Sequence, residues 1–512
     1  MLRRAIPLLI AALLCLAGCA KAPVGPVSSP TSYSDMDTSQ FVQLKMVLIG
    51  DEPKDAAIVQ EALSERIREA INATLSVRYL SWPDYSLKYA LLLAGAEQLD
   101  MIYTSNWCYY QAEAAKGAFY ELTDDFLESY LPRTLQSLPG EAFEQARIGG
   151  KLYMVPTSGP GIEGESWIVI RGDLRERYGL PPVETLEELE DYLRVVATSE
   201  FGVTPYDASG SVPLFHILYE QRYNLAVVAA GYPWITAYQE DHSLPDPSDI
   251  HFRYFTPEYL EFAWKMKSYA DWGFWSPAAL SVARQTRDSF ENGTSAMLVW
   301  NQTIFAAGKA LSDNNAEWTA EYIDLYPGTM RRLTLYTNDG TAIAAFSRHP
   351  ERAAMCIDVL KNDMDINDLF MGGIQGVHWI DVGSGFYAPG PDAAKYVWNH
   401  SQWAFSMPRA VRRYSTERTQ FELDFEAEQY TYIVRPAFES FQFNHTPVRN
   451  EWAAIISLEE EYKRMLELGV TENPADTIEE FRVKLYAAGL EVVEEEFFAQ
   501  YNAWCAQKAP AG

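Results

Sequence analysis

The stretch FVQLKMVLIGDEP, residues 41–53, decides the fold class of this chain. Its first nine residues are mostly apolar and predict a buried strand that ends before Gly50. Val59, Leu63 and Ile67 then follow at helical spacing, and residues 75–80 and 98–103 predict two further strands with a second helix between them. Strand–helix–strand alternation is typical of a parallel α/β sheet. Such a sheet binds ligands in the loops that follow the carboxyl ends of its strands.

A second α/β unit is predicted further along the chain. Residues 167–170 and 295–300 read as strands, Thr185 and Glu188 form a capping box, and Thr256-Pro257 begins another helix. The last third is helical: capping boxes at 457–460 and 477–480 predict two helix starts, and a final helix covers residues 490–504. The chain therefore contains two α/β units and a helical C-terminal region.

The N-terminus has the parts of a secretory signal. Arg3 and Arg4 precede an apolar run of about 12 residues, which is short of the roughly 20 that span a bilayer. The run ends in LAGC, residues 16–19, which resembles the bacterial lipobox. That resemblance implies cleavage before Cys19 and lipid attachment to Cys19. Residues 1–18 are the predicted signal peptide, and the Pro-, Ser- and Gly-rich residues 19–40 are the predicted flexible tether.

Composition limits the kinds of partner. The formal net charge of −29 disfavours binding to nucleic acid, and 512 residues are enough for two or more lobes. The cysteines and histidines have no metal-ligand spacing, so no metal is predicted. GGIQG, residues 372–376, lacks the strand-then-helix context of a dinucleotide site, and no GxSxG elbow is present. We therefore predict no cofactor and no catalytic residue.

Several stretches carry a family resemblance. They are LIGDEPKD (residues 48–55), LSWPDY (80–85), DMIYTSNW (100–107), KGAFYELT (116–123), KLYMVP (151–156) and TPVRNE (446–451). In this order and spacing the chain resembles the extracellular solute-binding lipoproteins of bacterial ABC importers, in family 1, which includes maltose-binding protein. It is most similar to a Gram-positive branch with a C-terminal region of unknown function, DUF3502.

The resemblance implies an α/β, two-lobe periplasmic-binding-protein-like fold (type II) with a hinge and a helical C-terminal region. The first lobe is predicted over residues 41–160 plus 302–360, and the second over 161–301 plus 361–510 with the DUF3502-like helices. The implied function is that of a monomeric substrate-binding lipoprotein, not an enzyme. It would sit at the extracellular face of a bacterial cell membrane through its lipid anchor. It would capture a small-molecule solute, an oligosaccharide, by hinge closure and deliver it to the permease subunits of an ABC transporter.

Sugar recognition needs aromatic faces against the apolar side of the ring, with carboxylates and amides for its hydroxyls. Position after strands, aromatic turns and the resemblance select the candidates. The predicted ligand-binding residues are Asp51, Glu52, Trp82, Asp84, Asn106, Trp107, Trp234, Trp300, Asn301, Trp379 and Tyr387.

Alternatives stay open for several of these residues and for the function. Asp51 is equally suited to cap the helix that follows it, and Trp82 and Asp84 fit core packing as well as binding. Aromatic pockets also bind peptides. A surface glycoside hydrolase needs two carboxylates at about 5–5.5 Å or 6.5–9.5 Å. It and a ligand-sensing lipoprotein that does not transport are the alternative functions.

Overall fold

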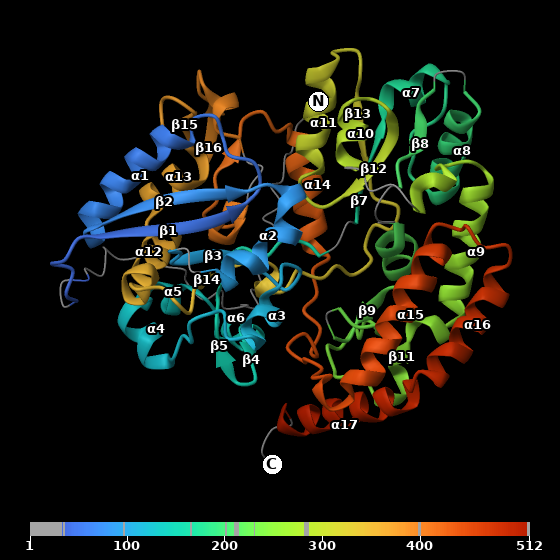
Figure 1. Ribbon diagram of the computed structural model, residues 1–512. Coiled ribbons are helices and arrows are strands. Elements are labelled where there is room, and N and C mark those ends of the chain that lie inside the picture. Colours follow the sequence, from blue (N-terminus) through green and yellow to red (C-terminus); the bar gives the residue numbers. More distant parts are fainter. Residues whose placement is uncertain are drawn as a thin grey trace, which may run out of the picture.

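The computed structural model describes residue 33 and residues 36–95, 98–163, 166–199, 202–208, 214–229, 231–280, 286–397 and 401–508. The predicted signal segment, the lipidation site Cys19 and most of the tether lie outside the described residues. Two lobes stand side by side, each built on its own β-sheet (Figure 1). No helix of the described part is both long and apolar enough to cross a membrane.

Lobe 1 contains a five-stranded sheet in the order β2-β1-β3-β14-β6. Its strands are β1 (Val42–Ile49), β2 (Ala73–Leu80), β3 (Met101–Thr104), β6 (Val155–Pro156) and β14 (Gly340–Ile343). The prediction of a parallel sheet is confirmed for β1, β2 and β3, which pair in parallel. β14 comes from a distant part of the sequence and inserts antiparallel between β3 and β6. The sheet is therefore mixed.

Helices cover the sheet of lobe 1 because their apolar stripes face it. α1 (Ala56–Ile71) buries Val59, Leu63 and Ile67, as their spacing predicts, and packs against α12 (Pro350–Asn362) and α13 (Met364–Gly372). α2 (Trp82–Ala94) begins directly after β2. The other elements of this lobe are α3 (Tyr110–Ala115), α4 (Asp124–Tyr130), α5 (Pro132–Ser137), α6 (Gly140–Ala146), β4 (Arg147–Ile148), β5 (Lys151–Leu152), β15 (Trp379–Gly383), β16 (Phe386–Pro389) and β17 (Tyr414–Ser415).

Lobe 2 contains a four-stranded sheet in the order β13-β7-β12-β8. Its strands are β7 (Trp167–Arg171), β8 (Thr204–Tyr206), β12 (Ser295–Trp300) and β13 (Ala320–Ile323). The predicted capping box is present at the start of α8 (Leu186–Ala197), and Thr256 caps α9 (Pro257–Asp271). The other elements here are α7 (Gly172–Arg177), β9 (Leu225–Val227), β10 (Trp234–Ala237), β11 (His251–Phe252), α10 (Thr286–Glu291), α11 (Ile304–Asn314) and α14 (Gln420–Thr431).

Three C-terminal helices complete lobe 2: the first two pack beside α9, and the third packs against those two (Figure 1). They are α15 (Arg449–Glu467), α16 (Pro474–Ala487) and α17 (Leu490–Lys508). The helical C-terminus is as predicted, but two of its predicted starts are wrong. α15 begins eight residues before Ser457, because Trp452 and Ile455 are buried and extend its apolar face. α16 is capped by Asn473, whose side chain accepts from the amides of Ala475 and Asp476.

The two cores divide the chain differently from the predicted boundaries. Residues 302–360 were expected in the first lobe, yet α11 and β13 belong to lobe 2, because β13 pairs antiparallel with β7 and buries Ile323. α13 and residues 401–405 were expected in the second lobe, yet Phe370 and Phe405 are buried in the core of lobe 1. The return to lobe 1 thus falls between β13 and β14.

Two crossover segments and a third strand meet in one β-ribbon between the lobes, which we call the hinge ribbon and which consists of residues 161–163, 331–334 and 432–434. The amide of Thr334 donates to the carbonyl of Gly161 at 2.8 Å, which joins the two crossovers. The amide of Val434 donates to the carbonyl of Arg331 at 2.7 Å, which joins the segment that follows α14. The chain makes its third passage between the lobes earlier, between β17 and α14.

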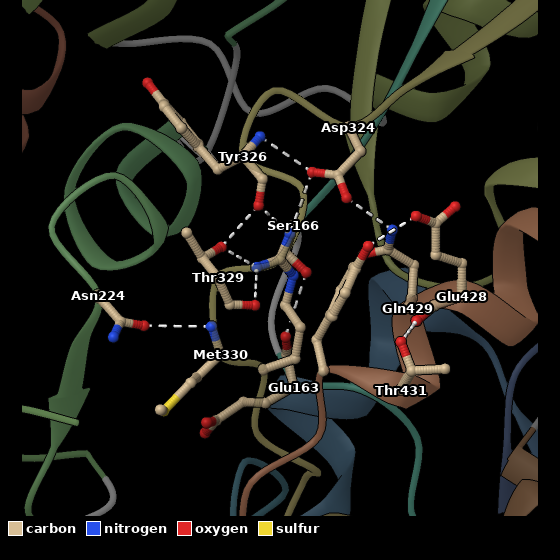
Figure 2. Close-up of polar contacts among 12 residues, drawn as sticks. Glu163, Ser166, Asn224, Asp324, Tyr326, Thr329, Met330, Glu428, Gln429 and Thr431 are labelled. Atoms are coloured by element: carbon tan, nitrogen blue, oxygen red, sulfur yellow. Dashed lines mark hydrogen bonds and ion pairs between the residues drawn. The ribbon is translucent and has the colours of Figure 1, made fainter. Parts of the chain in front are cut away.

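Side chains hold the middle segment of the hinge ribbon in place. Figure 2 shows the carboxylate of Asp324 accepting from the Tyr326 amide at 3.0 Å and from Gln429 Nε2 at 2.7 Å. The guanidinium of Arg331, only 4% exposed, donates to Asp324 and to the Thr329 carbonyl. Because the charge of this buried arginine is paired and hydrogen-bonded, removing Asp324 would leave it uncompensated.

Candidate functional site

A cleft of about 2920 Å³ lies between the lobes. It is far larger than the roughly 300–1,000 Å³ of a pocket for a drug-sized molecule. Lobe 1 lines it with Asp51, Trp82, Trp107, Asp339 and Trp403, and lobe 2 lines it with Ile162, Trp300 and Phe305. The segment between the 3-10 turn Ser401–Phe405 and β17 adds Met407, Arg412 and Arg413. The cleft has room for a ligand of several sugar or amino-acid units.

An aromatic platform forms the lobe 1 wall of this cleft and consists of Trp82, Tyr85, Trp107 and Trp403. The rings of Trp82 and Trp403 stack with centroids 5.9 Å apart and planes 8° from parallel. Trp107 stacks on the other side of Trp82 at 6.4 Å, and Tyr85 meets Trp82 edge-on at 5.8 Å. Since Trp107 is 41% exposed, the platform presents apolar ring surface to the cleft.

Strand ends position this platform. Trp82 follows the end of β2 and begins α2, and Trp107 follows β3. Both strands flank β1 and run parallel to it, so their loops emerge at the same edge of the sheet. Trp107 Nε1 donates to the carbonyl of Asn338 at 2.8 Å, which fixes the indole. Trp403 lies on the 3-10 turn Ser401–Phe405, which is distant in sequence from β2 and β3.

A carboxylate lies next to the platform. Asp339 lines the cleft and accepts a hydrogen bond from the hydroxyl of Tyr103 at 2.7 Å. Trp403 Nε1 donates to the same hydroxyl at 3.1 Å, so platform and carboxylate are connected through Tyr103. Burial raises the pKa of Asp339 above its ordinary value, although the bond from Tyr103 opposes this. The group is an oriented acceptor for a ligand hydroxyl.

The facing wall comes from the end of β12 and the start of α11. Trp300 is half-buried and lines the cleft, and Phe305 lies beyond it. Asn301 Oδ1 accepts from the amide of Thr303 at 2.9 Å and from its hydroxyl at 2.8 Å. Its oxygen is therefore engaged at the start of α11, and its amide nitrogen remains the group available to a ligand.

The cleft brings together seven of the eleven residues predicted from the sequence. Those that line it are Asp51, Trp82, Trp107, Trp300, Asn301, Trp379 and Tyr387. Trp379 is 7% exposed, and its Nε1 donates to the carbonyl of Gly373, so its role includes packing. Contact of these seven residues with a ligand stays a prediction.

Four predicted residues lie outside the cleft lining. Glu52 and Asn106 are exposed, and the half-buried Asp84 accepts from Lys88 and from Ser81 at the start of α2. Trp234 is a correction, because it is fully buried in the core of lobe 2. Its ring stacks on Phe497 at 4.0 Å and on Trp452 at 5.8 Å. α15 and α17 contribute these two aromatic rings and so cover Trp234 on β10. The sequence around Trp234 alone does not predict that these helices bury it.

Sequence reasoning missed Trp403, Asp339 and Arg412. Asp339-Gly340 has the pattern of a turn, which predicts local geometry but not that the turn faces a cleft. Trp403 and Arg412 follow no strand or helix pattern that would place them. All three reach the cleft through contacts with residues far away in sequence. Within the described ranges, no group of three or more His, Cys, Asp or Glu side chains could hold a metal ion.

Comparison with known proteins finds similarity to solute-binding proteins. Residues 437–506 match the family described as "Domain of unknown function (DUF3502)". A carbohydrate ABC transporter substrate-binding protein of Streptococcus pneumoniae serotype 4 is 23% identical over 493 residues, which are 92% of this chain and 93% of that protein. The predicted resemblance to the solute-binding proteins of ABC importers, including the DUF3502 region, is thereby confirmed.

Solved structures agree in fold. The N-glycan transport solute binding protein NgtS from Streptococcus pneumoniae aligns with a TM-score of 0.73 at 19% identity, over 92% of this chain and 100% of that one. The alginate-binding protein AlgQ2 aligns with a TM-score of 0.64 at 15% identity, over 90% and 98% of the two chains. The predicted α/β two-lobe fold of type II is thus confirmed.

Proposed function

We propose that this chain, a two-lobe solute-binding protein with a DUF3502 region, is the substrate-binding component of an ABC importer for oligosaccharides. The observation that carries the proposal is the aromatic platform beside the Asp339 carboxylate, on one wall of a large cleft between two hinged lobes.

The platform and the carboxylate match the two faces of a sugar ring. The partly exposed indoles of Trp82, Trp107 and Trp403 line the cleft, and their free surface suits the apolar C–H face of a pyranose. Asp339, oriented by Tyr103, offers an acceptor for hydroxyls at the ring edge. Since three indoles line the same wall, the wall suits more than one sugar unit.

Capture uses the hinge. A ligand that contacts the platform of lobe 1 and the Trp300 wall of lobe 2 at the same time favours the closed form. Shifting the lobes from 1:99 to 99:1 closed requires about 5.5 kcal/mol of preference for the closed state. Burying two further aromatic walls against sugar is of this order, at about 25 cal/mol per Å² of apolar surface. The closed form is the state that a permease would recognise.

The relatives support sugar over peptide. NgtS has been solved in complex with Man1GlcNAc and with Man5GlcNAc, and the Streptococcus pneumoniae protein FusA in complex with kestose. These are saccharide ligands of proteins that share the fold of this chain over about nine-tenths of its length.

The remaining parts of the proposal concern location. The lipid on Cys19 would hold a monomer at the extracellular face of a bacterial cell membrane, beside its permease. Such an anchor is useful because a net charge of −29 repels an anionic membrane surface. A tether of about 20 residues would leave the lobes free to open and close.

Titration calorimetry tests the proposal. The full chain, purified in detergent, is titrated with a panel of neutral and acidic tri- to hexasaccharides, and separately with a panel of tri- to pentapeptides. We expect at least one saccharide to bind with micromolar or tighter affinity and no peptide to do so. Binding of peptides alone would overturn the substrate class, and measurable hydrolysis of a bound saccharide would favour the glycosidase.

A further inference from the structure

The charges of the cleft are unevenly matched. Five cationic side chains line it, and four of them are neutralised by a carboxylate of this chain. The pairs are Arg287 with Glu291, Lys309 with Asp313, Arg413 with Asp368, and Arg418 with Glu426. Arg412 is the exception: no carboxylate of the described residues lies within 4.0 Å of its guanidinium.

Arg412 therefore differs from the other cations that line the cleft. The chain has 70 acidic and 41 basic residues, so carboxylates are available in excess to pair with each arginine. Arg412 is half-buried, and a guanidinium partly removed from water gains from a partner that carries negative charge. The guanidinium of an unpaired arginine at the lining of a binding cleft is therefore available to an anion that the protein does not itself supply.

The backbone leaves space for this guanidinium. A Cβ atom at Gly159 would lie 3.1 Å from Arg412 Nη2 and 2.8 Å from the carbonyl oxygen of Met407. Gly159 and Met407 also line the cleft, Gly159 just before the first crossover and Met407 just after the Ser401–Phe405 turn. Because Gly159 has no side chain, Arg412 can lie against the first crossover at the point where the two lobes meet.

A second arginine strengthens the positive potential nearby. Arg409 lies over the ring of Tyr430 at 4.0 Å, and its Nε donates to the hydroxyl of Tyr414 at 3.2 Å. No carboxylate of the described part lies within 4.0 Å of Arg409 either. Both arginines act on the same ring, since each lowers the pKa of Tyr430 against the larger effect of burial. The segment just before β17 thus carries two positive charges that no described carboxylate neutralises within 4.0 Å.

We propose that Arg412 binds an anionic substituent of the ligand, so that the transported oligosaccharide is acidic rather than neutral. This inference rests on the proposed function and narrows its substrate class. A carboxylate, sulfate or phosphate accepts two parallel hydrogen bonds from the planar guanidinium fork, which a single neutral hydroxyl cannot. The aromatic platform of lobe 1 then stacks on the sugar rings, while Arg412 holds the charged group at the hinge.

The location gives the contact a role in closure. Arg412 lies in lobe 1, between the Ser401–Phe405 turn and β17, and against Gly159 just before the first crossover, so a ligand bound there is held next to a segment that connects both lobes. Bringing an anion into an enclosed, strongly acidic protein costs free energy unless it meets a localised cation. A neutral saccharide carries no charge that needs a cation, and it leaves Arg412 unpaired when the lobes close.

Matched ligand pairs test the proposal. The full chain is titrated with sialyllactose and lactose, tetragalacturonate and its methyl ester, and chondroitin sulfate tetrasaccharide with its desulfated form. We expect an acidic member to bind roughly 10- to 100-fold more tightly than its neutral partner, which is the range of charged hydrogen bonds. The three pairs separate sialic acid, uronate and sulfate as the source of the charge.

Variants assign the preference to Arg412. Arg412→Gln is expected to remove the preference for the acidic member, and Arg412→Lys to retain part of it, because a point charge remains without the fork. Arg66→Gln, at an exposed position on α1 outside the cleft lining, makes the same change in net charge and is expected to keep the full preference. Thermal melting checks that each variant is folded.

The outcomes separate the two proposals. Equal affinity for acidic and neutral partners, or a preference that survives Arg412→Gln, would overturn the anion site and leave the oligosaccharide importer intact. Absence of binding to every saccharide, in these pairs and in the wider panel, would overturn both.

Discussion

Replacing Glu439 by glutamine is expected to stabilise the protein at pH 8 and to leave its stability almost unchanged at pH 4.5. Glu439 is 8% exposed and follows the hinge ribbon. Arg435 Nη1 lies 2.9 Å from Glu439 Oε2 and 3.7 Å from Glu141 Oε2, on α6 of lobe 1. Glu439 Oε1 is buried and has no hydrogen-bond partner in the described structure. Two carboxyl groups therefore share one arginine across the interface of the lobes.

The expected magnitude follows from the pKa of Glu439. Burial raises that pKa from 4.5 to about 7, since Arg435 only partly offsets burial and the neighbouring Glu141 raises it further. Below pH 4.5 the group is protonated in both folded and unfolded chains, and its contribution to stability is complete. Between pH 4.5 and 7 the unfolded chain loses the proton first, so stability falls by about 1.4 kcal/mol per pH unit, or about 3 kcal/mol in all.

Urea unfolding at pH 4.5, 6 and 8, followed by tryptophan fluorescence, measures this effect. Glutamine keeps the shape of the protonated side chain and does not titrate, so Glu439→Gln should exceed the parent protein by about 3 kcal/mol at pH 8. Glu69→Gln, at an exposed position on α1, controls for the change in net charge and should show no such gain. A Glu439→Gln protein that is less stable than the parent at pH 8, or a difference that does not vary with pH, would refute the reasoning.

Three further changes have defined outcomes. Trp403→Ala removes one ring of the stacked Trp82–Trp403 pair and should weaken saccharide binding by roughly 10- to 100-fold in calorimetry. The control Trp264→Ala, at an exposed position on α9, should change the affinity less than twofold. Equal losses in the two variants would contradict a role of the platform in binding. Trp234→Ala should destabilise lobe 2 by about 3–5 kcal/mol in scanning calorimetry, because the ring is fully buried; an unchanged melting temperature would contradict this placement. Asn473→Ala should cost about 1 kcal/mol in urea unfolding through loss of the α16 cap, and no loss would show that the cap is dispensable.

Local patterns in the sequence predict the elements of the fold well where one segment determines its own structure. The strands at β1, β2 and β12 and the caps at Thr185 and Thr256 lie where spacing and cap residues place them. The predicted starts of α15 and α16 were wrong. The start of α15 depends on packing and that of α16 on the Asn473 cap, whereas the Ser- and Thr-containing stretches inside these helices have the local sequence pattern of a capping box.

The site is predictable only in part, for a physical reason. Loops after parallel strands converge at one sheet edge, and this rule brings Asp51, Trp82 and Trp107 to the cleft. Trp403 and Asp339 reach the same wall from segments more than 200 residues away, through the hydrogen bonds of Tyr103. No local pattern encodes such a meeting. Trp234 shows the converse, since an aromatic turn reads alike whether it faces a cleft or a core.

The late arrival of β14 has a consequence for how the protein reaches its native state. Lobe 1 begins at residue 42, yet the position between β3 and β6 is filled only by residues 340–343. Until that segment is made, β3 and β6 have unpaired edges, and such edges join strands from other chains. Lobe 2 is completed later still, when α15 and α16 pack against α9 and α17 packs against α15 and α16. Neither lobe is a contiguous folding unit, so fragments that end before residue 340 should aggregate rather than fold, and the chain has to be kept apart from its copies until nearly all of it has been made.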